Sequence, residues 1–397
     1  MTTMLHITCR DPIVARDGRP FGDRQGNRMR SLDWPLPSVL AGSLRTALGK
    51  SAGRNFSTQD AQELLQVEVA GPFPRVNEQL FLPAPEDCIV HPKRGPLRAT
   101  PWSQEKGGCD WPKAGLLPVG LTQPSEDFKP AEKPAWWPLN RYAEWLVGKD
   151  IAFDDFLCSA EKEERTHVKI DPSAGAAEET QLFTTAALAL SHLPRYRTET
   201  EREGSADPKK ACRKETSLTR FVEITLSARV RADGWCSETV AKFDMLHPLG
   251  GERRLAHWKA IAEVAAWQCP PKLRAALAQA QRVRMVLATP AIFREGWKPG
   301  WLDEALVGSP PGTGVAMRLV GVSIQRWKAV SGWSLAELPG QPRGPKPVKR
   351  MVPAGGVYFF EIIGGSAADL ADRWLEPVSD DEQDRRDGFG LAAWGIW

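Results

Sequence analysis

The chain has 397 residues, enough for two domains or one elaborated domain, and its composition of 42% hydrophobic and 25% charged residues is ordinary for a globular protein. A formal net charge of +3 does not demonstrate nucleic-acid binding, because a basic footprint must be local to matter. The seven cysteines contain no Cys-x-x-Cys pair, and the chain has no apolar signal core or membrane span, so we expect a protein of the reducing cytoplasm without a structural zinc site.

The first residues predict a strand followed by a loop. Leu5, Ile7 and Cys9 alternate with polar neighbours, as in a half-buried strand. Residues 11–26 carry turn residues and charges without periodicity, which indicates a loop.

A helix is expected next. Leucines recur every four residues on one face, at Leu40, Leu44 and Leu48. Ser38 is placed to cap this helix at its start, and Gly49 is placed to end it. Two strand-like segments follow, at residues 65–70 and 79–83.

The middle of the chain contains two segments without clear periodicity. Residues 92–164 are rich in Pro, Gly and Trp and are interpreted as an insertion with one helical stretch at residues 139–147. Strand-like segments return at residues 166–170 and 182–190. Residues 195–220 combine many charges with little apolar content, which predicts a solvated, mobile loop.

The second half of the chain begins with the clearest strand pattern. Five apolar residues alternate with other residues: Val222, Ile224, Leu226, Ala228 and Val230. The further predicted elements are a helix at residues 253–268, strands near 283–288, 315–325 and 356–363, a helix at 367–375 and a strand at 389–397. This order resembles a ferredoxin-like βαββαβ unit, and the first half shows a weaker version of it.

We therefore expect an α+β fold with two ferredoxin-like units, long insertions and glycine-rich loops. The first unit would span residues 1–220, with insertions at about 92–164 and 195–220. The second would span residues 221–397 and include a basic loop at residues 341–351.

Known catalytic motifs are missing from the sequence. The six histidines show no His-x-x-x-His or His-Glu-x-x-His spacing, and no Walker A, Gly-x-Ser-x-Gly or Gly-x-Gly-x-x-Gly sequence is present. The acidic run at residues 380–384 is interpreted as a solvated linker rather than a metal site. His167, at a basic strand start, could act as general base of a metal-independent ribonuclease. The alternative is an RNA contact or a structural histidine, because no second acid–base group is visible nearby.

Binding features are more numerous, and the first lies in the N-terminal loop. Arg16 and Arg19 flank a glycine turn that also contains Asp17, and an arginine fork can donate two hydrogen bonds to one phosphate. Asp17 and Arg19 could equally pair with each other and fix the turn. The predicted helix start offers free backbone N–H groups to an anion. Three polar side chains lie within its first two turns: Ser38, Ser43 and Arg45.

Three further segments could approach RNA closely. Gly250 and Gly251 precede two arginines, Arg253 and Arg254, at the expected helix start. The loop at residues 341–351 has no acidic residue and carries basic side chains, among them Lys346, Lys349 and Arg350. The C-terminal strand has bare positions at Gly388 and Gly390. Each segment has a structural alternative: a helix-entry turn for the glycine pair and its arginines, a solvated loop for residues 341–351, and an edge strand with bulges for the C-terminal strand.

In this order the motifs resemble the RAMP superfamily of CRISPR proteins, and most closely the third subunit of the type III-B Cmr effector complex. The resemblance rests on residues 11–21 (DPIVARDGRPF), 35–45 (PLPSVLAGSLR), 167–183 (HVKIDPSAGAAEETQLF) and 249–254 (LGGERR). It continues in residues 287–293 (LATPAIF) with Gly296 and Trp297, in residues 321–332 and in the glycine-spaced C-terminus. Residues 92–164 and 195–220 contain no matching motif.

The resemblance implies two ferredoxin-like, RRM-like units and a non-catalytic role in antiviral RNA-guided defence, with no cofactor and no metal. Such a subunit looks like a clamp for the repeat-derived 5′ handle of the crRNA. It would pack against the large polymerase-like subunit and the first backbone RAMP subunit, and would meet target RNA only indirectly. A metal-independent crRNA-processing endoribonuclease of the same superfamily is the alternative, and a subunit that contacts only protein is a second one.

By the same resemblance, the loop at residues 16–19 with Ser38, Ser43 and Arg45 would meet the handle. His167 and Lys169 would lie on the same surface, and Arg253 and Arg254 are further candidates. One exposed hairpin or loop should wedge between RNA bases and flip one of them out. Residues 92–164 and residues 195–220 are both candidates for this element.

Overall fold

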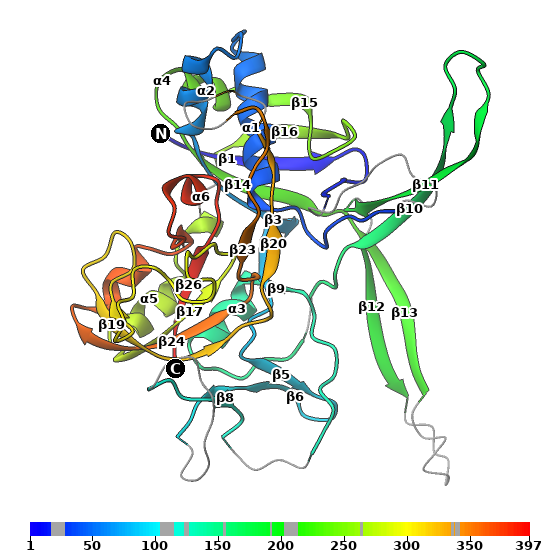
Figure 1. Ribbon diagram of the computed structural model, residues 1–397. Helices are drawn as coiled ribbons and strands as arrows, with labels where there is room; N and C mark the ends of the chain where they lie inside the picture. The colour runs from blue at the N-terminus through cyan, green and yellow to red at the C-terminus, as the bar shows by residue number, and fades with distance from the viewer. Residues whose placement is uncertain are drawn as a thin grey trace.

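The computed structural model describes residues 1–16, 28–103, 115–122, 127–153, 156–190, 193–201, 213–262, 265–334, 337 and 342–397. These residues form an α+β fold in which strands greatly outnumber helices. Two large antiparallel sheets make up the body, and two long hairpins project from one side of it (Figure 1). The expected α+β class is therefore confirmed.

The first sheet has seven strands, and every neighbouring pair is antiparallel. In spatial order the strands are β15 (Asp244–Pro248), β16 (Leu255–Ile261), β1 (Thr2–Cys9), β14 (Thr225–Arg231), β3 (Glu68–Val76), β4 (Gln79–Pro83) and β9 (Trp136–Pro138). Of these strands, β1, β3, β14 and β16 come first, second, third and fourth along the chain. Across the sheet they lie in the order fourth, first, third, second (β16-β1-β14-β3). Helix α1 (Pro37–Ser51) connects β1 to β3, and α4 (Gly234–Val240) lies between β14 and β15.

The second sheet repeats this strand order. Its six antiparallel strands are β18 (Val307–Gly308), β19 (Ala316–Ser323), β24 (Val357–Gly364), β17 (Arg282–Leu287), β26 (Leu391–Ile396) and β25 (Glu376–Pro377). Here β17, β19, β24 and β26 come first to fourth along the chain, and across the sheet they again lie in the order fourth, first, third, second (β26-β17-β24-β19). Helix α5 (Pro271–Leu277) precedes β17, while the 3₁₀ helix η2 (Ala367–Ala371) and α6 (Glu382–Arg386) lie between β24 and β26.

The remaining elements decorate this body. They are α2 (Thr58–Leu65), α3 (Leu139–Leu146), the 3₁₀ helix η1 (Ala265–Trp267) and six further ladders, two of which are the long hairpins. The ladders are β5 (Cys88–His91) with β6 (Gly95–Arg98), β7 (Thr100–Pro101) with β8 (Val119–Gly120), β10 (Glu161–Ile170) with β11 (Ala177–Ala189) and β2 (Arg28–Met29), β12 (Leu193–Glu201) with β13 (Arg213–Val222), β20 (Lys328–Val330) with β23 (Lys349–Met351), and β21 (Trp333–Ser334) with β22 (Gly344–Pro345). None of the helices in the described parts of the chain has the length and apolar character needed to cross a membrane.

The expected boundary between residues 220 and 221 does not separate the two sheets. β14, β15 and β16 all follow residue 220, yet they belong to the same sheet as β1, and β14 and β16 pair directly with it. The division between the sheets falls after Ile261, where β16 ends, and before Arg282, where β17 begins.

The helix that carries the leucine stripe is present, but its ends differ from the prediction. Leu40, Leu44 and Leu48 are buried, as expected. The N-cap is Leu36 and Pro37 occupies the first turn, where its missing N–H costs nothing. Ser38 therefore lies inside the helix and makes no cap hydrogen bond, and the helix continues past Gly49 to Ser51.

Two predictions of secondary structure are wrong. Residues 253–268 are not a helix, because Leu255–Ile261 forms β16 with buried Ala256 and Trp258 alternating with more exposed neighbours. Residues 195–220 are not a loop throughout, because β12 and β13 pair as a long antiparallel hairpin with Thr198 opposite Thr216. High charge indicates exposure to solvent, but it does not prevent the backbones of two exposed strands from pairing.

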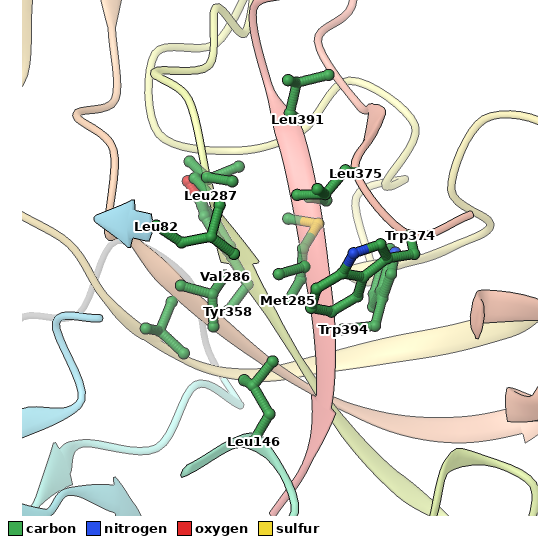
Figure 2. Packing of buried hydrophobic residues seen from close by; sticks show 14 of the residues in the cluster. Leu82, Leu146, Met285, Val286, Leu287, Tyr358, Trp374, Leu375, Leu391 and Trp394 are labelled. Carbon is green, nitrogen blue, oxygen red and sulfur yellow. The ribbon is translucent and has the colours of Figure 1, made fainter. Parts of the chain in front are cut away.

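The core of the second sheet continues into the predicted insertion. Met285, Val286 and Leu287 of β17 lie against Leu391 and Trp394 of β26, and Leu146 of α3 reaches the same cluster (Figure 2). Since α3 lies within residues 92–164, this region is partly built into the core rather than attached outside it.

Buried ion pairs join the two sheets. Glu376 of β25 accepts hydrogen bonds from Arg231 of β14 at 2.7 and 2.5 Å, and Arg229 of β14 lies 2.9 Å from the same carboxylate. Burial lowers the pKa of Arg229 to about 10. Although burial raises the pKa of Glu376, the hydrogen bond from Arg231 and the two guanidinium charges lower it below its usual value.

A second buried pair is completely enclosed. Asp87, in the segment between β4 and β5, pairs with Arg284 of β17, and both side chains are 0% exposed. Trp145 of α3 donates its indole N–H to the Asp87 carboxylate at 2.9 Å, and Arg284 donates to the Trp145 carbonyl. Three distant segments therefore meet at one pair of charges.

Replacement of Asp87 tests this pair. Asp87→Asn is expected to lower the free energy of unfolding by about 3–5 kcal/mol, because the buried Arg284 charge loses its partner. Urea unfolding of the purified chain measures the loss. Asp372→Asn is the matched control, since it breaks a pair with Arg274 whose side chains are 72% and 51% exposed, and it should cost less than about 1 kcal/mol. Equal losses in the two variants would contradict the assignment.

Candidate nucleic-acid interface

The candidate interface begins at β2, where basic side chains alternate with buried ones. Arg28 and Arg30 are exposed, whereas Met29 and Ser31 between and after them are buried. β2 runs parallel to β11, with Arg28 beside Thr184, and Ser31 exchanges hydrogen bonds with the Ala15 backbone. The strand pattern thus directs both arginines to the same exposed side.

A cleft lies where β2, the base of the β10–β11 hairpin and β20 meet. Its wall carries four basic side chains, Arg28, Arg30, Lys162 and Lys328. It also carries two acidic ones, Asp33 and Glu164. Lys162 pairs with Asp33 at 2.7 Å, and Arg28 lies 3.9 Å from Glu164. The cleft therefore keeps a local positive excess, which the small net charge of the chain does not reveal.

One wall of the cleft belongs to a basic arm, which we define as the described residues between 326 and 351. The arm consists of two successive ladders, β20–β23 and β21–β22. Val330 and Met351 at its base are buried in a cluster with Leu36 and Phe389. Lys349 pairs with Asp384 at 2.8 Å, so it anchors the arm to α6 instead of facing a ligand. Burial raises the pKa of Asp384, and Lys349 opposes that shift.

The glycine pair at residues 250–251 packs against the backbone of the N-terminal segment and not against a ligand. The Gly251 N–H donates to the Val14 carbonyl at 2.7 Å, and a Cβ on Gly250 would lie 2.5 Å from the same oxygen. Gly250 also has φ +79°, which favours glycine. The turn connects β15 to β16 rather than starting a helix, and Arg253 is exposed on it with φ 52°. Arg254 is half-buried.

This turn and the N-terminal segment reach the cleft region together. Val14 bridges to Gly251, and Arg16 bridges to Ser31 of the segment that follows β2. The structure therefore places Arg16 beside the segment that carries Arg28 and Arg30, while Val14 of the same N-terminal segment pairs with the turn that carries Arg253. Asp17 and Arg19 lie outside the described residues.

His167 and Lys169 lie on β10 of a projecting hairpin. His167 Nε2 is 2.9 Å from the Thr185 hydroxyl, and its ring stacks on Phe183 with centroids 5.1 Å apart. Lys169 pairs with Glu178 at 3.1 Å. These contacts favour the structural interpretation of His167 over a general base.

Several predicted site residues lie elsewhere. Arg45 is buried, pairs with Asp387 at 2.5 Å and donates to the Val67 carbonyl at 2.8 Å, so its guanidinium faces protein and not RNA. Gly388 and Gly390 also face protein, since a Cβ at these positions would lie 2.4 Å from the Val69 carbonyl and 2.5 Å from the Ser379 hydroxyl. Ser38 and Ser43 are half-buried along α1.

The acidic run before the last strand is a structural junction and not a solvated linker. Asp380 accepts backbone N–H groups from Arg294 and Gly300, both at 2.8 Å, and Asp381 caps α6. Together with the partners of Asp384 and Asp387, this run fixes α6 against α1 and the arm. Within the described residues, no group of three or more His, Cys, Asp or Glu side chains could hold a metal ion.

Sequence analysis did not name two exposed tryptophans of the arm. Trp327 and Trp333 of the arm are 46% and 63% exposed, and the Arg350 guanidinium lies 4.7 Å from the Trp327 ring centroid. The tripeptide from Arg326 to Lys328 interleaves an aromatic residue with two basic ones, which is a recognisable nucleic-acid signal. The alternation of Arg28 and Arg30 around Met29 is a second sequence signal for nucleic-acid binding.

An α+β fold with a basic cleft and exposed aromatic side chains is suited to binding an extended polyanion. A family comparison makes the class specific: the model described as "CRISPR-associated protein (Cas_Cmr3)" matches residues 5–397. The chain belongs to the Cas_Cmr3 family of CRISPR-associated proteins. This membership confirms the resemblance to the third Cmr subunit.

Two solved structures are similar at low identity. A chain of the type III-B Cmr-beta complex bound to cognate target RNA shares 13% identity with a TM-score of 0.49, over 97% of this chain and 95% of that one. A chain of the Csm3–Csm4 subcomplex of the type III-A CRISPR-Cas interference complex shares 10% identity with a TM-score of 0.36, over 91% and 94%. The curated proteins give no match.

Replacement of Arg45 separates a structural role from RNA contact. Arg45→Ala is expected to cost about 3–5 kcal/mol of stability, because Asp387 stays buried without its partner. The salt dependence of RNA binding should not change, since no phosphate contact is lost. Urea unfolding and an RNA titration at several salt concentrations measure the two effects. Full stability combined with a weaker salt dependence would contradict this placement.

Proposed function

We propose that this chain is a non-catalytic crRNA-binding subunit of a type III-B CRISPR effector, which clamps the 5′ repeat-derived handle. The observation that carries the proposal is the basic cleft between β2 and the arm, in a member of the Cas_Cmr3 family. The subunit would join the large polymerase-like subunit to the first backbone subunit and act in the cytoplasm. Target RNA would be contacted only indirectly.

Each sheet is proposed to be the sheet of one ferredoxin-like unit. A βαββαβ unit places its strands in the spatial order fourth, first, third, second, and β16-β1-β14-β3 and β26-β17-β24-β19 both have this order. On this basis the first unit runs from β1 to β16 and the second from β17 to β26. Residues 77–224 are then a long insertion between the second and third strands of the first unit.

Handle recognition would combine two kinds of contact. Arg28, Arg30 and Lys328 would neutralise phosphates in the cleft, with Arg16 and Arg253 extending the surface beyond β2. Sequence readout would come from unpaired bases, because single-stranded RNA exposes base edges and faces to protein. A small net charge is compatible with this role, since the cleft has a local excess of four basic over two acidic side chains.

The element that wedges between bases is proposed to be the β12–β13 hairpin. Its strands, Leu193–Glu201 and Arg213–Val222, pair along their length and project from the body (Figure 1). The other candidate, residues 92–164, contributes Tyr142, Trp145 and Leu146 to the core. The part of this segment that fills the core cannot enter an RNA strand, whereas the hairpin projects along its whole length, which favours the hairpin.

The cleft predicts a salt-dependent loss of handle binding. Arg28→Ala, Arg30→Ala and Lys328→Ala should each weaken binding of handle-bearing RNA by the reconstituted complex. Each lost phosphate contact should reduce the slope of log K against log salt by about 0.7. Arg318→Ala is the control, because that exposed arginine pairs with Glu361 on the second sheet, outside the cleft. Binding that is unchanged in all three cleft variants, or equal for RNA without the handle, would overturn handle recognition.

The non-catalytic assignment has its own test. Repeat RNA incubated with the purified protein in EDTA is expected to remain intact, because the ring nitrogen of His167 is held by Thr185 and its ring by Phe183. Denaturing gel electrophoresis measures any cleavage. Cleavage that disappears in His167→Ala would establish the endoribonuclease alternative instead.

A further inference from the structure

We propose that the basic arm is a stacking platform for unpaired RNA bases, with Trp333 and the Trp327–Arg350 pair as its two stacking positions. This inference rests on the proposed RNA-binding function and assigns the arm a role different from phosphate neutralisation. It concerns the faces of the bases, whereas the cleft concerns the backbone.

The exposure of the two indoles is the first observation. Trp333 is 63% and Trp327 46% exposed, whereas Trp137, Trp145, Trp258 and Trp394 are fully buried. A large apolar ring in water is unfavourable, so two of them on one narrow arm indicate a surface that is covered in use. Trp327 already carries a guanidinium over its ring, which is a geometry that a base can extend by stacking.

The charge of the arm identifies the occupant as nucleic acid. Residues 326–351 contain six basic side chains and a single acidic one, Glu337. A protein partner would need a matching acidic surface, but an RNA strand supplies one phosphate with every base. The aliphatic stem of Lys346 lies against Gly332, directly before Trp333, so charge and ring are adjacent on the arm.

The arm is also built to hold its rings in place. Prolines at 342, 345 and 347 restrict the returning strand, and Trp333 pairs with Pro345 across the ladder. At the base, buried Val330 and Met351 and the Lys349–Asp384 pair fix the arm to the body. A preorganised ring loses less conformational entropy when a base stacks on it.

The arm adjoins the cleft through its first strand. Lys328 of β20 lines the same cleft as Arg28 and Arg30, and Val348 on the returning strand lines it too. A strand whose phosphates lie in the cleft can therefore continue along the arm with its bases against the indoles. Only unpaired bases offer their faces in this way, so the arm selects single-stranded over duplex RNA.

The test compares tryptophan variants within the reconstituted complex, with fluorescence anisotropy of handle RNA as the readout. Trp333→Ala and Trp327→Ala should weaken binding roughly 5- to 100-fold each, as expected for one lost base stack. The salt slope should stay unchanged, because no phosphate contact is removed. Trp333→Phe should recover most of the affinity, and Trp102→Ala, at an exposed tryptophan outside the arm, should have no effect.

Abasic RNA completes the experiment. At the stacked position, removal of the base should weaken binding to the wild type but not further weaken binding to Trp333→Ala. Unchanged affinity in both alanine variants, while Arg28→Ala and Lys328→Ala still weaken binding, would overturn the stacking role and leave the proposed function standing. Loss of complex assembly with unchanged RNA affinity would show that the arm binds a protein subunit instead. If neither RNA affinity nor complex assembly decreased in any variant, the cleft variants included, the proposed function itself would be overturned.

Discussion

The arrangement of the two sheets depends on the buried pair between Asp87 and Arg284. Both charges are fully enclosed, so each is stable only because the other, together with Trp145, supplies its hydrogen bonds. Asp87 follows a strand of the first sheet, Arg284 lies in the second, and Trp145 belongs to the insertion. A shift of any one of the three would expose a charge to an apolar interior, which sets their relative position tightly.

A second set of ion pairs fixes the candidate RNA surface to the body of the protein. The segment around α6 holds Arg45 through Asp387 and Lys349 through Asp384, so the same few residues contact α1 and the arm. Gly388 lies against the β3 backbone next to this segment and has no room for a side chain. The arm is therefore fixed relative to the first sheet. Its position beside β2 follows from these contacts and from the buried Val330 and Met351 at its base.

Much of the fold could be predicted where one face of an element is buried. The leucine stripe of α1 follows from burial on one side, and the structure confirms it. The apolar residues of β1 and β14 that alternate in the sequence are also buried, although β14 is buried on both faces because Ser227 and Arg229 are enclosed as well. The helix expected at residues 253–268 is wrong because Ala256, Trp258 and Ala260 recur with a period of two, which is the period of a strand, and this segment pairs with β1. The β12–β13 hairpin was not predicted because the charge of a segment indicates solvent exposure but does not indicate whether its backbone pairs.

The site was harder to predict because sequence reveals basic residues but not their partners. Arg45 and Lys349 look like phosphate ligands in a sequence, yet both neutralise acidic side chains within the protein. The cleft still carries four basic side chains against two acidic ones, and the arm adds further exposed basic side chains. This explains how a chain with a net charge of +3 can present a basic surface. The local excess, and not the total, determines whether a polyanion is attracted. The exposed indoles beside it are the reason why we propose a polyanion with unpaired bases.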